Sequence, residues 1–264
     1  MMGTVYHKPT TISDAQTAFD EADEPRYLAG GMTLLPTMRQ RLVAPDRLID
    51  LAKCDLRSIE DQGAVIKIGA MTTHHEIASS PIISEKIAGL SVLAGGIGDR
   101  QVRHRGTIGG SLANNDPAAC YPAAILALGA IIQTSKRQIA AADYFVDMFE
   151  TALEEGELIT AIIVPVPQKS AYHKAPNPAS RYALAGVFAA MVDDMPYLAV
   201  TGAGEQGVFR WREAEDALSE SWSKEALASL SLAEDGLLSD IHATAAFRAH
   251  LVKQMAQKSV EAAL

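Results

Sequence analysis

The first 52 residues alternate between the apolar spacing of helices and the short apolar runs of strands. Over residues 10–23 apolar side chains recur every three or four positions, and Thr11 or Ser13 can cap the helix that this spacing predicts. Pro36 fits the first turn of a second helix, where a missing N–H group costs little. We therefore expect a compact β/α unit with helices at 10–23 and 33–42 and strands at 26–31 and 46–51.

The next stretch, to about residue 170, contains apolar patterns typical of helices and others typical of strands. The two kinds of element do not alternate strictly along the chain. Residues 64–70 alternate apolar and polar side chains around Lys67, as a half-buried strand does. An apolar helix is predicted over 121–130, with Pro122 near its start. The remaining expected elements are helices at 74–79 and 84–98, a hairpin of 130–134 with 137–141, and a strand at 157–167.

A segment rich in proline, asparagine and lysine, residues 167–180, marks a boundary before the C-terminal part. The last predicted helix begins near Ala245 and places Phe247, Leu251 and Met255 on one face. Before it we expect strands at 181–192, 197–204 and 208–211, and two further helices. Mixed strands and helices without βαβ alternation favour an α+β protein over a doubly wound sheet.

Composition narrows the possible functions. The 264 residues carry a net charge of −9 and no long lysine–arginine block, which argues against nucleic acid and anionic membranes as partners. We expect no signal peptide and no integral membrane segment, because no apolar run approaches the roughly 20 residues that span a bilayer. Only two cysteines, Cys54 and Cys120, are present, which indicates a cytoplasmic location without a disulfide framework. Two thiolates also cannot ligate an iron–sulfur cluster that needs four.

Two glycine-rich segments, 28–36 and 105–117, stand out from the rest of the chain. Glycine lets backbone approach a ligand closely, successive N–H groups can enclose an anion, and a helix that starts just afterwards adds its dipole. Thr33, Thr107 and Ser111 add hydroxyl donors. The obvious ligand is a phosphate, and two such segments could hold a pyrophosphate between them.

Spacing alone leaves a second interpretation open, because one glycine pair after a strand usually forms a tight turn. Neither segment contains the GK[ST] of a Walker loop or the GxGxxG of a Rossmann site, so neither of those nucleotide folds is supported.

The motifs AGGMTLLPTMRQR and RHRGTIGGSLANNDPAACYPA together resemble the flavoprotein subunit of the molybdenum hydroxylases. That family includes the medium subunit of carbon monoxide dehydrogenase and the flavin domain of xanthine dehydrogenase. Weaker similarities in GELITAIIVPVP, HKAPNPASRYALAGVFAA and LSDIHATAAFRAHLVKQMAQKSV extend the resemblance nearly end to end. It implies a two-part FAD-binding unit of the vanillyl-alcohol-oxidase type, residues 1–52 and 53–170, followed by a small α/β domain, residues 171–264.

The resemblance also implies which residues contact FAD. Residues 28–34 would enclose the pyrophosphate from one side and residues 107–111 from the other. Ile97, Lys174 and Tyr182 correspond to positions beside the flavin ring, and Ile159 to one near the adenine. The expected contacts are therefore Leu28, Ala29, Gly30, Gly31, Met32, Thr33, Leu34, Ile97, Thr107, Ile108, Gly109, Gly110, Ser111, Asp116, Ile159, Lys174 and Tyr182.

Two positions depart from the family's pattern. Cys120 replaces an aspartate that contacts the flavin in some relatives, and Asp116, four residues earlier, is the residue that could take over part of that contact. Met32 stands where relatives often have a polar residue, which removes one possible hydrogen bond to phosphate. Cys120 itself is expected to be a packed thiol, because no cationic residue lies close to it in the sequence.

Two further clusters invite a functional interpretation. His74, His75 and Glu76 suggest a metal site, but adjacent side chains on a helix point apart, so we expect a surface helix there. The basic run 100–105 fits either a solvated face or a role in positioning the glycine segment or docking a partner.

No carboxylate pair, Ser–His–Asp set or metal site emerges, as expected where a cofactor carries the electron chemistry. The resemblance implies an FAD-carrying electron-transfer subunit of a multi-subunit molybdenum hydroxylase. Substrate would be oxidised at a molybdenum cofactor on a large subunit, and electrons would reach FAD through iron–sulfur clusters on a small subunit and leave to an external acceptor. The alternatives are a stand-alone FAD oxidase or reductase of the same fold class and a nucleotide-binding regulator or assembly factor without flavin.

Overall fold

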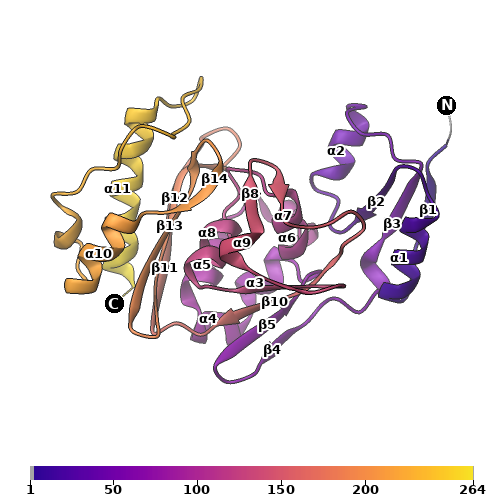
Figure 1. Ribbon diagram of the computed structural model, residues 1–264, viewed down its shortest axis with the longest axis horizontal. Coiled ribbons are helices and arrows are strands. Elements are labelled where there is room, and N and C mark those ends of the chain that lie inside the picture. The colour runs from indigo at the N-terminus through magenta and orange to yellow at the C-terminus, as the bar shows by residue number, and fades with distance from the viewer. Residues whose placement is uncertain (1–2, 264) are drawn as a thin grey trace.

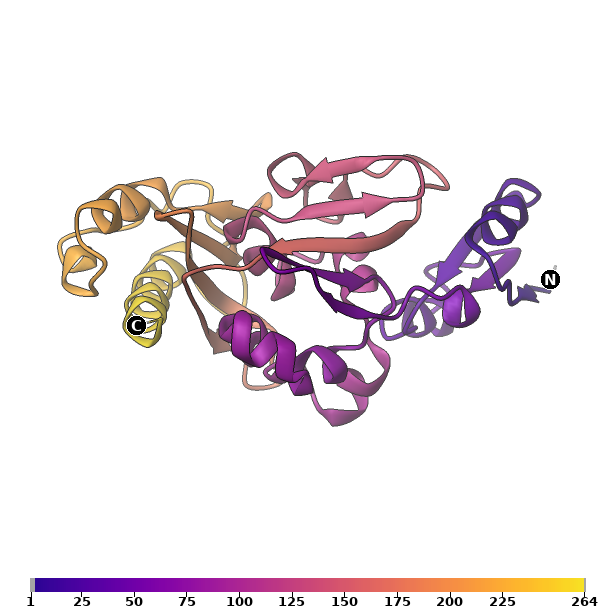
Figure 2. The ribbon, with the colours of Figure 1, turned by 90° about the horizontal axis from the view of Figure 1, so that it is seen from below.

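The protein is a mixed α/β structure, described here by a computed structural model of residues 3–263. The molecule is elongated, with the N-terminal sheet at one end and the C-terminal sheet and helices at the other (Figure 1). A five-stranded sheet and a group of short helices lie between these ends, and the view turned by 90° keeps the same order (Figure 2).

The N-terminal part is a three-stranded parallel sheet with two helices, and the expected helices and strands are confirmed. Its strands are β1 (Val5–His7), β2 (Pro25–Leu28) and β3 (Arg47–Asp50), in the order β1-β3-β2, and its helices are α1 (Ile12–Asp20) and α2 (Leu34–Arg39). Thr11 caps α1, since its hydroxyl oxygen accepts a hydrogen bond of 3.0 Å from the N–H of Asp14. Strand β1 had no counterpart among the expected elements.

The middle part is an antiparallel sheet covered by helices. The sheet runs β4 (Ile59–Asp61), β5 (Val65–Gly69), β10 (Ile159–Pro165), β6 (Ile131–Thr134), β7 (Gln138–Ala140). A 3₁₀ turn, Leu51–Lys53, leads into it, and the hairpin β8 (Phe145–Asp147) and β9 (Glu150–Thr151) lies beside it. The helices are α3 (His74–Ser79), α4 (Pro81–Lys86), α5 (Ala88–Gly95), α6 (Arg100–Arg105), α7 (Ile108–Asn114), α8 (Tyr121–Ala127) and α9 (Ala141–Tyr144).

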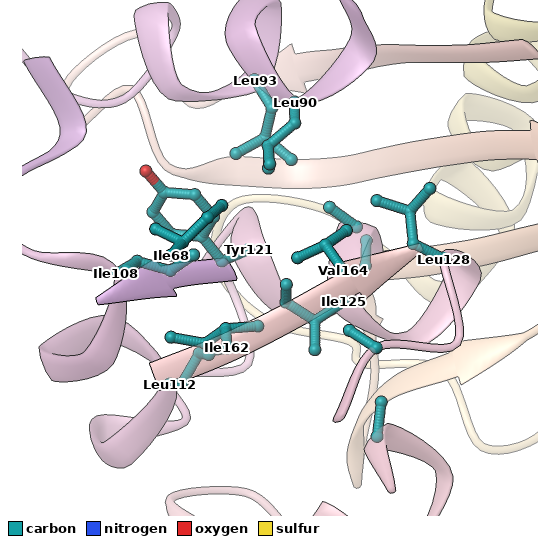
Figure 3. Close-up of a cluster of buried hydrophobic side chains, with 14 of the residues drawn as sticks. Ile68, Leu90, Leu93, Ile108, Leu112, Tyr121, Ile125, Leu128, Ile162 and Val164 are labelled. Atoms are coloured by element: carbon teal, nitrogen blue, oxygen red, sulfur yellow. The ribbon is translucent and has the colours of Figure 1, made fainter. Parts of the chain in front are cut away.

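One hydrophobic core joins this sheet to its helices. Figure 3 shows side chains of β5 and β10, such as Ile68 and Ile162, together with Leu93 of α5 and Ile125 of α8. The same core continues to Phe188 of the C-terminal sheet. The helices α5 and α8 therefore also pack against the C-terminal sheet, whereas α7 packs against β10 of the middle sheet.

Two expectations for the middle part were wrong. The single helix predicted over 84–98 is two helices, because the chain bends at Ile87 (φ −139°, ψ 61°), whose side chain is fully buried. The segment 105–117, expected to be a loop, is largely the helix α7, capped by Thr107. Gly109 and Gly110 have low helix propensity, so the local sequence did not indicate a helix here. The surrounding packing stabilises it.

The C-terminal part is an antiparallel sheet with helices on one face. Its strands, in order, are β11 (Lys169–Pro176), β12 (Ala183–Val192), β13 (Met195–Gly204) and β14 (Gly207–Arg210), and they are followed by α10 (Arg212–Glu220), a 3₁₀ turn at Glu225–Leu227 and α11 (Ala245–Ala262). Most of the polar segment 167–180 is thus the strand β11. It lies at the sheet edge, where polar residues and proline are tolerated.

The long helix α11 begins where predicted, but its buried face was misjudged. Phe247 is half exposed, whereas Val252, Met255 and Ser259 are buried. Arg248 is buried too, and its guanidinium donates to the carbonyl oxygens of Leu184 and Gly202. A pattern based on hydrophobicity counts arginine as polar, so it cannot reveal an arginine that is buried and hydrogen-bonded through its Nη atoms, which explains the shift. Among residues 3–263, no helix combines the length and apolar character that crossing a membrane requires.

Candidate functional site

A cavity of about 760 Å³ lies where the N-terminal part meets the middle helices and the start of the C-terminal sheet. Its volume falls in the range of roughly 300–1,000 Å³ typical of small-molecule sites. The cavity wall includes all the expected FAD contacts except Leu28 and Ile108, namely Ala29, Gly30, Gly31, Met32, Thr33, Leu34, Ile97, Thr107, Gly109, Gly110, Ser111, Asp116, Ile159, Lys174 and Tyr182. Leu28 ends strand β2 and is buried, and the Ile108 side chain is part of the main core.

The first glycine segment offers backbone donors at the cavity wall. Within the described part of the chain, the N–H groups of Gly30, Gly31, Met32 and Thr33 donate to no protein acceptor. Gly31 adopts φ +76°, a left-handed conformation that glycine reaches without strain. Successive free N–H groups before a helix form an anion-binding arrangement, so this wall can bind phosphate.

The second glycine segment is arranged differently from what we expected. Most of its backbone N–H groups are already engaged: Ile108 donates to the Thr72 carbonyl at 3.1 Å and Gly109 to the Ala70 carbonyl at 2.9 Å. Gly110 donates to the capping hydroxyl of Thr107 at 3.1 Å. A Cβ atom on Gly109 would lie 2.6 Å from that of Ala70, so this glycine permits close packing of α7 on the chain before α3. The groups that this wall presents are therefore mainly hydroxyls, together with the Thr107 N–H, which donates to no acceptor among the described residues.

At the other side of the cavity, Lys174 connects three segments. Its ammonium donates to the carbonyl oxygens of Gly96 and Arg181, each at 2.9 Å, and lies 3.5 Å from Sγ of Cys120. All three N–H donors of the lysine are thus directed at protein groups. The expectation that Cys120 has no cationic neighbour holds only along the sequence, because the fold brings Lys174 to it across 54 residues.

Tyr182 and Asp116 lie near the same thiol. The Tyr182 side chain is 49% exposed and forms part of the cavity wall. Burial, followed by the charges of Asp116 and Cys120, raises the pKa of the Tyr182 hydroxyl, so the phenol stays neutral. Burial also raises the pKa of Asp116, although its carboxylate accepts a 2.9 Å hydrogen bond from the N–H of Ala118.

His74 is a cavity residue that sequence reasoning placed wrongly. We expected a surface helix, but only 5% of His74 is exposed and its ring forms part of the cavity wall. Burial, with a smaller contribution from Arg103, lowers the pKa of His74 to about 4. Thr73 and Glu76 form a capping box that fixes the start of α3, but this local signal says nothing of whether His74 is buried. No cluster of metal-ligating side chains occurs among the described residues.

The basic run of α6 contributes to the site through one of its members. Arg103 donates from Nη1 to the carbonyl oxygen of Ile97 at 2.9 Å, and so fixes the bend between α5 and α6. This contact favours the positioning role for Arg103 over a purely solvated one.

Comparison with known proteins identifies the family. Residues 1–167 match the family described as the FAD binding domain in molybdopterin dehydrogenase. The chain belongs to this family. The carbon monoxide dehydrogenase medium chain of Afipia carboxidovorans is 39% identical over 189 residues, which cover 68% of this chain and 66% of that one. The nicotine 6-hydroxylase medium subunit of Paenarthrobacter nicotinovorans is 31% identical over 271 residues, covering 97% and 95%.

The fold agrees with the sequence comparison. A solved structure of the Cu,Mo-CO dehydrogenase contains a chain that superimposes with a TM-score of 0.89 at 32% identity, covering 99% of this chain and 97% of that one. The quinoline 2-oxidoreductase of Pseudomonas putida 86 gives a TM-score of 0.88 at 28% identity, covering 99% and 96%. This member of the molybdopterin dehydrogenase family is therefore an FAD-binding oxidoreductase component with the fold of those flavoprotein chains.

FAD can be tested against the groups in the cavity. The free N–H groups of residues 30–33 suit a pyrophosphate, and the apolar side chains of Ile97 and Ile159 suit flat aromatic rings. Tyr182 adds an exposed aromatic face. The residues of this molybdopterin dehydrogenase component therefore fit the cofactor of its family.

Proposed function

We propose that the protein is the FAD-carrying electron-transfer subunit of a multi-subunit molybdenum hydroxylase. The observation that carries this proposal is the convergence in one cavity of two glycine segments and two C-terminal residues, Lys174 and Tyr182. These groups come from three distant parts of the chain, and they match a ligand with one anionic and one aromatic portion. Bound FAD would supply the ability to accept electrons and pass them on.

In the proposed binding mode, the segment Leu28–Leu34 holds the pyrophosphate through the free N–H groups of residues 30–33, and Thr107 and Ser111 add hydroxyls from the opposite wall. The flavin ring lies toward Ile97, Lys174 and Tyr182, and the adenine toward Ile159. Ile108 and Gly109 then act through the position of α7 rather than through donors of their own. Asp116 remains at the flavin end, beside Cys120.

This binding mode also defines the proposed division of the chain. Residues 1–52 and 53–170 would be the two parts of an FAD-binding unit of the vanillyl-alcohol-oxidase type. Residues 171–264 would form a smaller α/β domain that adds Lys174 and Tyr182 to the flavin end. Isolated fragments 1–170 and 171–264 would test the division, and only the first should retain measurable FAD binding.

The partners in this proposal are a small subunit with iron–sulfur clusters and a large subunit with the molybdenum cofactor. Two relatives named above are called a medium chain or a medium subunit, which describes components of larger enzymes. Two cysteines fall short of the four thiolates that a cluster requires, so clusters would reside on a partner. A cytoplasmic location, expected from the same low cysteine content, belongs to this proposal as well.

Stopped-flow absorbance at the flavin band tests the proposed function. The isolated FAD-loaded chain should be bleached by dithionite but not by an aldehyde, a purine or carbon monoxide. Adding the two partner subunits should restore bleaching by the substrate of the complex. Rapid bleaching of the isolated chain by one of these substrates would overturn the proposal in favour of a stand-alone flavoenzyme. A chain that takes up no FAD at all would favour a regulator or assembly factor.

A further inference from the structure

The imidazole of His74 is held in one position by several independent contacts. The His74 N–H donates to the carbonyl oxygen of Gly106 at 2.9 Å, and the imidazole ring lies 5.2 Å from the Tyr121 ring, centroid to centroid. A Cβ atom on Gly106 would lie 2.5 Å from Nε2 of His74, so the glycine keeps space for the ring. These contacts fix where each ring nitrogen lies.

The two nitrogens differ in their surroundings. Nδ1 is buried and has no hydrogen-bond partner among the described residues. Nε2 is not enclosed in this way. A neutral imidazole carries one proton, and a buried N–H without an acceptor is rarer and costlier than a buried lone pair. The proton therefore resides on Nε2. Because burial and the Arg103 charge keep the ring neutral, Nε2 is a neutral donor at the cavity wall.

This donor adds to the few that the second glycine segment offers to the cavity. Of the backbone N–H groups in the neighbouring segment Gly106–Gly110, only that of Thr107 has no acceptor among the described residues. An acceptor of a bound ligand on this side can meet the hydroxyls of Thr107 and Ser111, and it can meet His74. Of these groups, only His74 contributes a donor whose direction is fixed by a rigid ring.

We propose that His74 donates its Nε2–H to an oxygen or nitrogen acceptor of bound FAD, and is thus a further cofactor-contacting residue. The inference rests on the proposed function for the presence of FAD in this cavity. It distinguishes His74 from an ordinary core histidine, which would keep the same tautomer but would not respond to the cofactor.

Nitrogen-15 NMR of histidine-labelled protein tests the contact directly. Before FAD is added, the His74 signals should show the Nε2–H tautomer, without titration between pH 6 and 8. Adding FAD should shift the Nε2 signal of His74 and leave that of the exposed His75 unchanged. A proton on Nδ1, or an Nε2 signal that does not move while FAD binds, would overturn the inference and leave the proposed function intact.

Two substitutions separate the hydrogen bond from the packing. His74→Gln retains an amide donor and should hold FAD within about threefold of the wild-type affinity, whereas His74→Leu should bind it about five- to tenfold more weakly. His75→Gln is the matched control and should change nothing. Thermal unfolding without FAD shows whether each variant is folded, and a folded His74→Leu variant with wild-type affinity would contradict the contact. Failure of the wild-type protein to bind FAD would instead reject the proposed function.

Discussion

A Cβ atom on Gly30 would lie 2.0 Å from the carbonyl oxygen of Arg105. The backbone of the first glycine segment thus packs directly against the backbone at the end of α6. This contact joins the N-terminal part to the middle helices. Both residues border the same region, since Gly30 lines the large cavity and both line a smaller, adjacent one of about 340 Å³. The glycine serves the packing of two chain segments as well as the approach of a ligand.

Gly30→Ala should therefore weaken both the fold and FAD binding. The methyl group cannot fit beside the Arg105 oxygen, and overpacking of this kind costs about 1–3 kcal/mol of unfolding free energy. The free N–H groups of residues 30–33 would move with it. Urea unfolding and an FAD fluorescence titration measure the two effects. Gly95→Ala is the control, because its Cβ would lie 3.8 Å from that of Ala78 in ordinary contact, and it should unfold at no lower urea concentration than wild type.

Bound FAD should protect Cys120 from alkylation. Both cysteines are buried, but Cys120 lines the cavity beside Lys174, whereas the Cys54 thiol is directed at the carbonyl oxygens of Pro9 and Thr11 away from it. Iodoacetamide should label Cys120 in the FAD-free protein at least about tenfold faster than in the FAD-loaded protein, since the cofactor fills the approach to the sulfur. Peptide mass spectrometry measures the labelling of both cysteines, and Cys54 should react slowly with or without FAD. Equal labelling of Cys120 with and without FAD would place the cofactor elsewhere.

The sequence alone predicted much of the fold because many elements carry local signals. Thr11 caps α1, Pro36 lies in the first turn of α2, and apolar alternation marks β5. The glycine segments were predicted to meet at one site, and both line the cavity. Local signals failed where distant packing decides the outcome, as in α7, where Gly109 packs against Ala70 and donates to its carbonyl oxygen.

The chemistry of the site was harder to predict than its location. The Lys174–Cys120 contact joins residues 54 positions apart, and no spacing rule reveals it. Hydrophobic patterns count histidine and arginine as polar, so they gave no sign that His74 and Arg248 are buried. In both cases the neighbours that permit burial, Gly106 for His74 and the Leu184 carbonyl for Arg248, are far away in the chain.

His74 should make the protein sensitive to mild acid. Its pKa is about 4 in the folded chain against an ordinary value of 6.5, so above pH 6.5 both folded and unfolded states leave it neutral and its full contribution is present. Between pH 6.5 and 4 only the unfolded state takes up the proton, and the unfolding free energy falls by up to about 3 kcal/mol. Below pH 4 this group causes no further loss.

The difference in stability between wild type and His74→Gln isolates this effect from the carboxylates, which titrate in both proteins. Urea unfolding at intervals from pH 7.5 to 4.5 should show that difference shifting steadily in favour of the variant as the pH falls. The comparison of wild type with His75→Gln should stay flat, because His75 is exposed. A constant difference between wild type and His74→Gln would mean that His74 is protonated as easily in the folded state as in the unfolded one.

Lys174→Met should release the segment that carries Tyr182. The Lys174 ammonium holds the Arg181 carbonyl, and Arg181 has an unfavourable φ of +62° that needs such support. Without that bond, trypsin should cut after Arg181 about tenfold faster, because local opening becomes more frequent. FAD affinity should fall, since Tyr182 and Lys174 both line the cavity.

Lys169→Met is the matched control on the same strand. The Lys169 ammonium lies 5.8 Å from the Trp222 ring centre, so cleavage after Arg181 and FAD affinity should both stay at wild-type levels in this variant. An unchanged cleavage rate in Lys174→Met would show that the segment is held by its own turn, through the Asn177 contacts, rather than by the lysine.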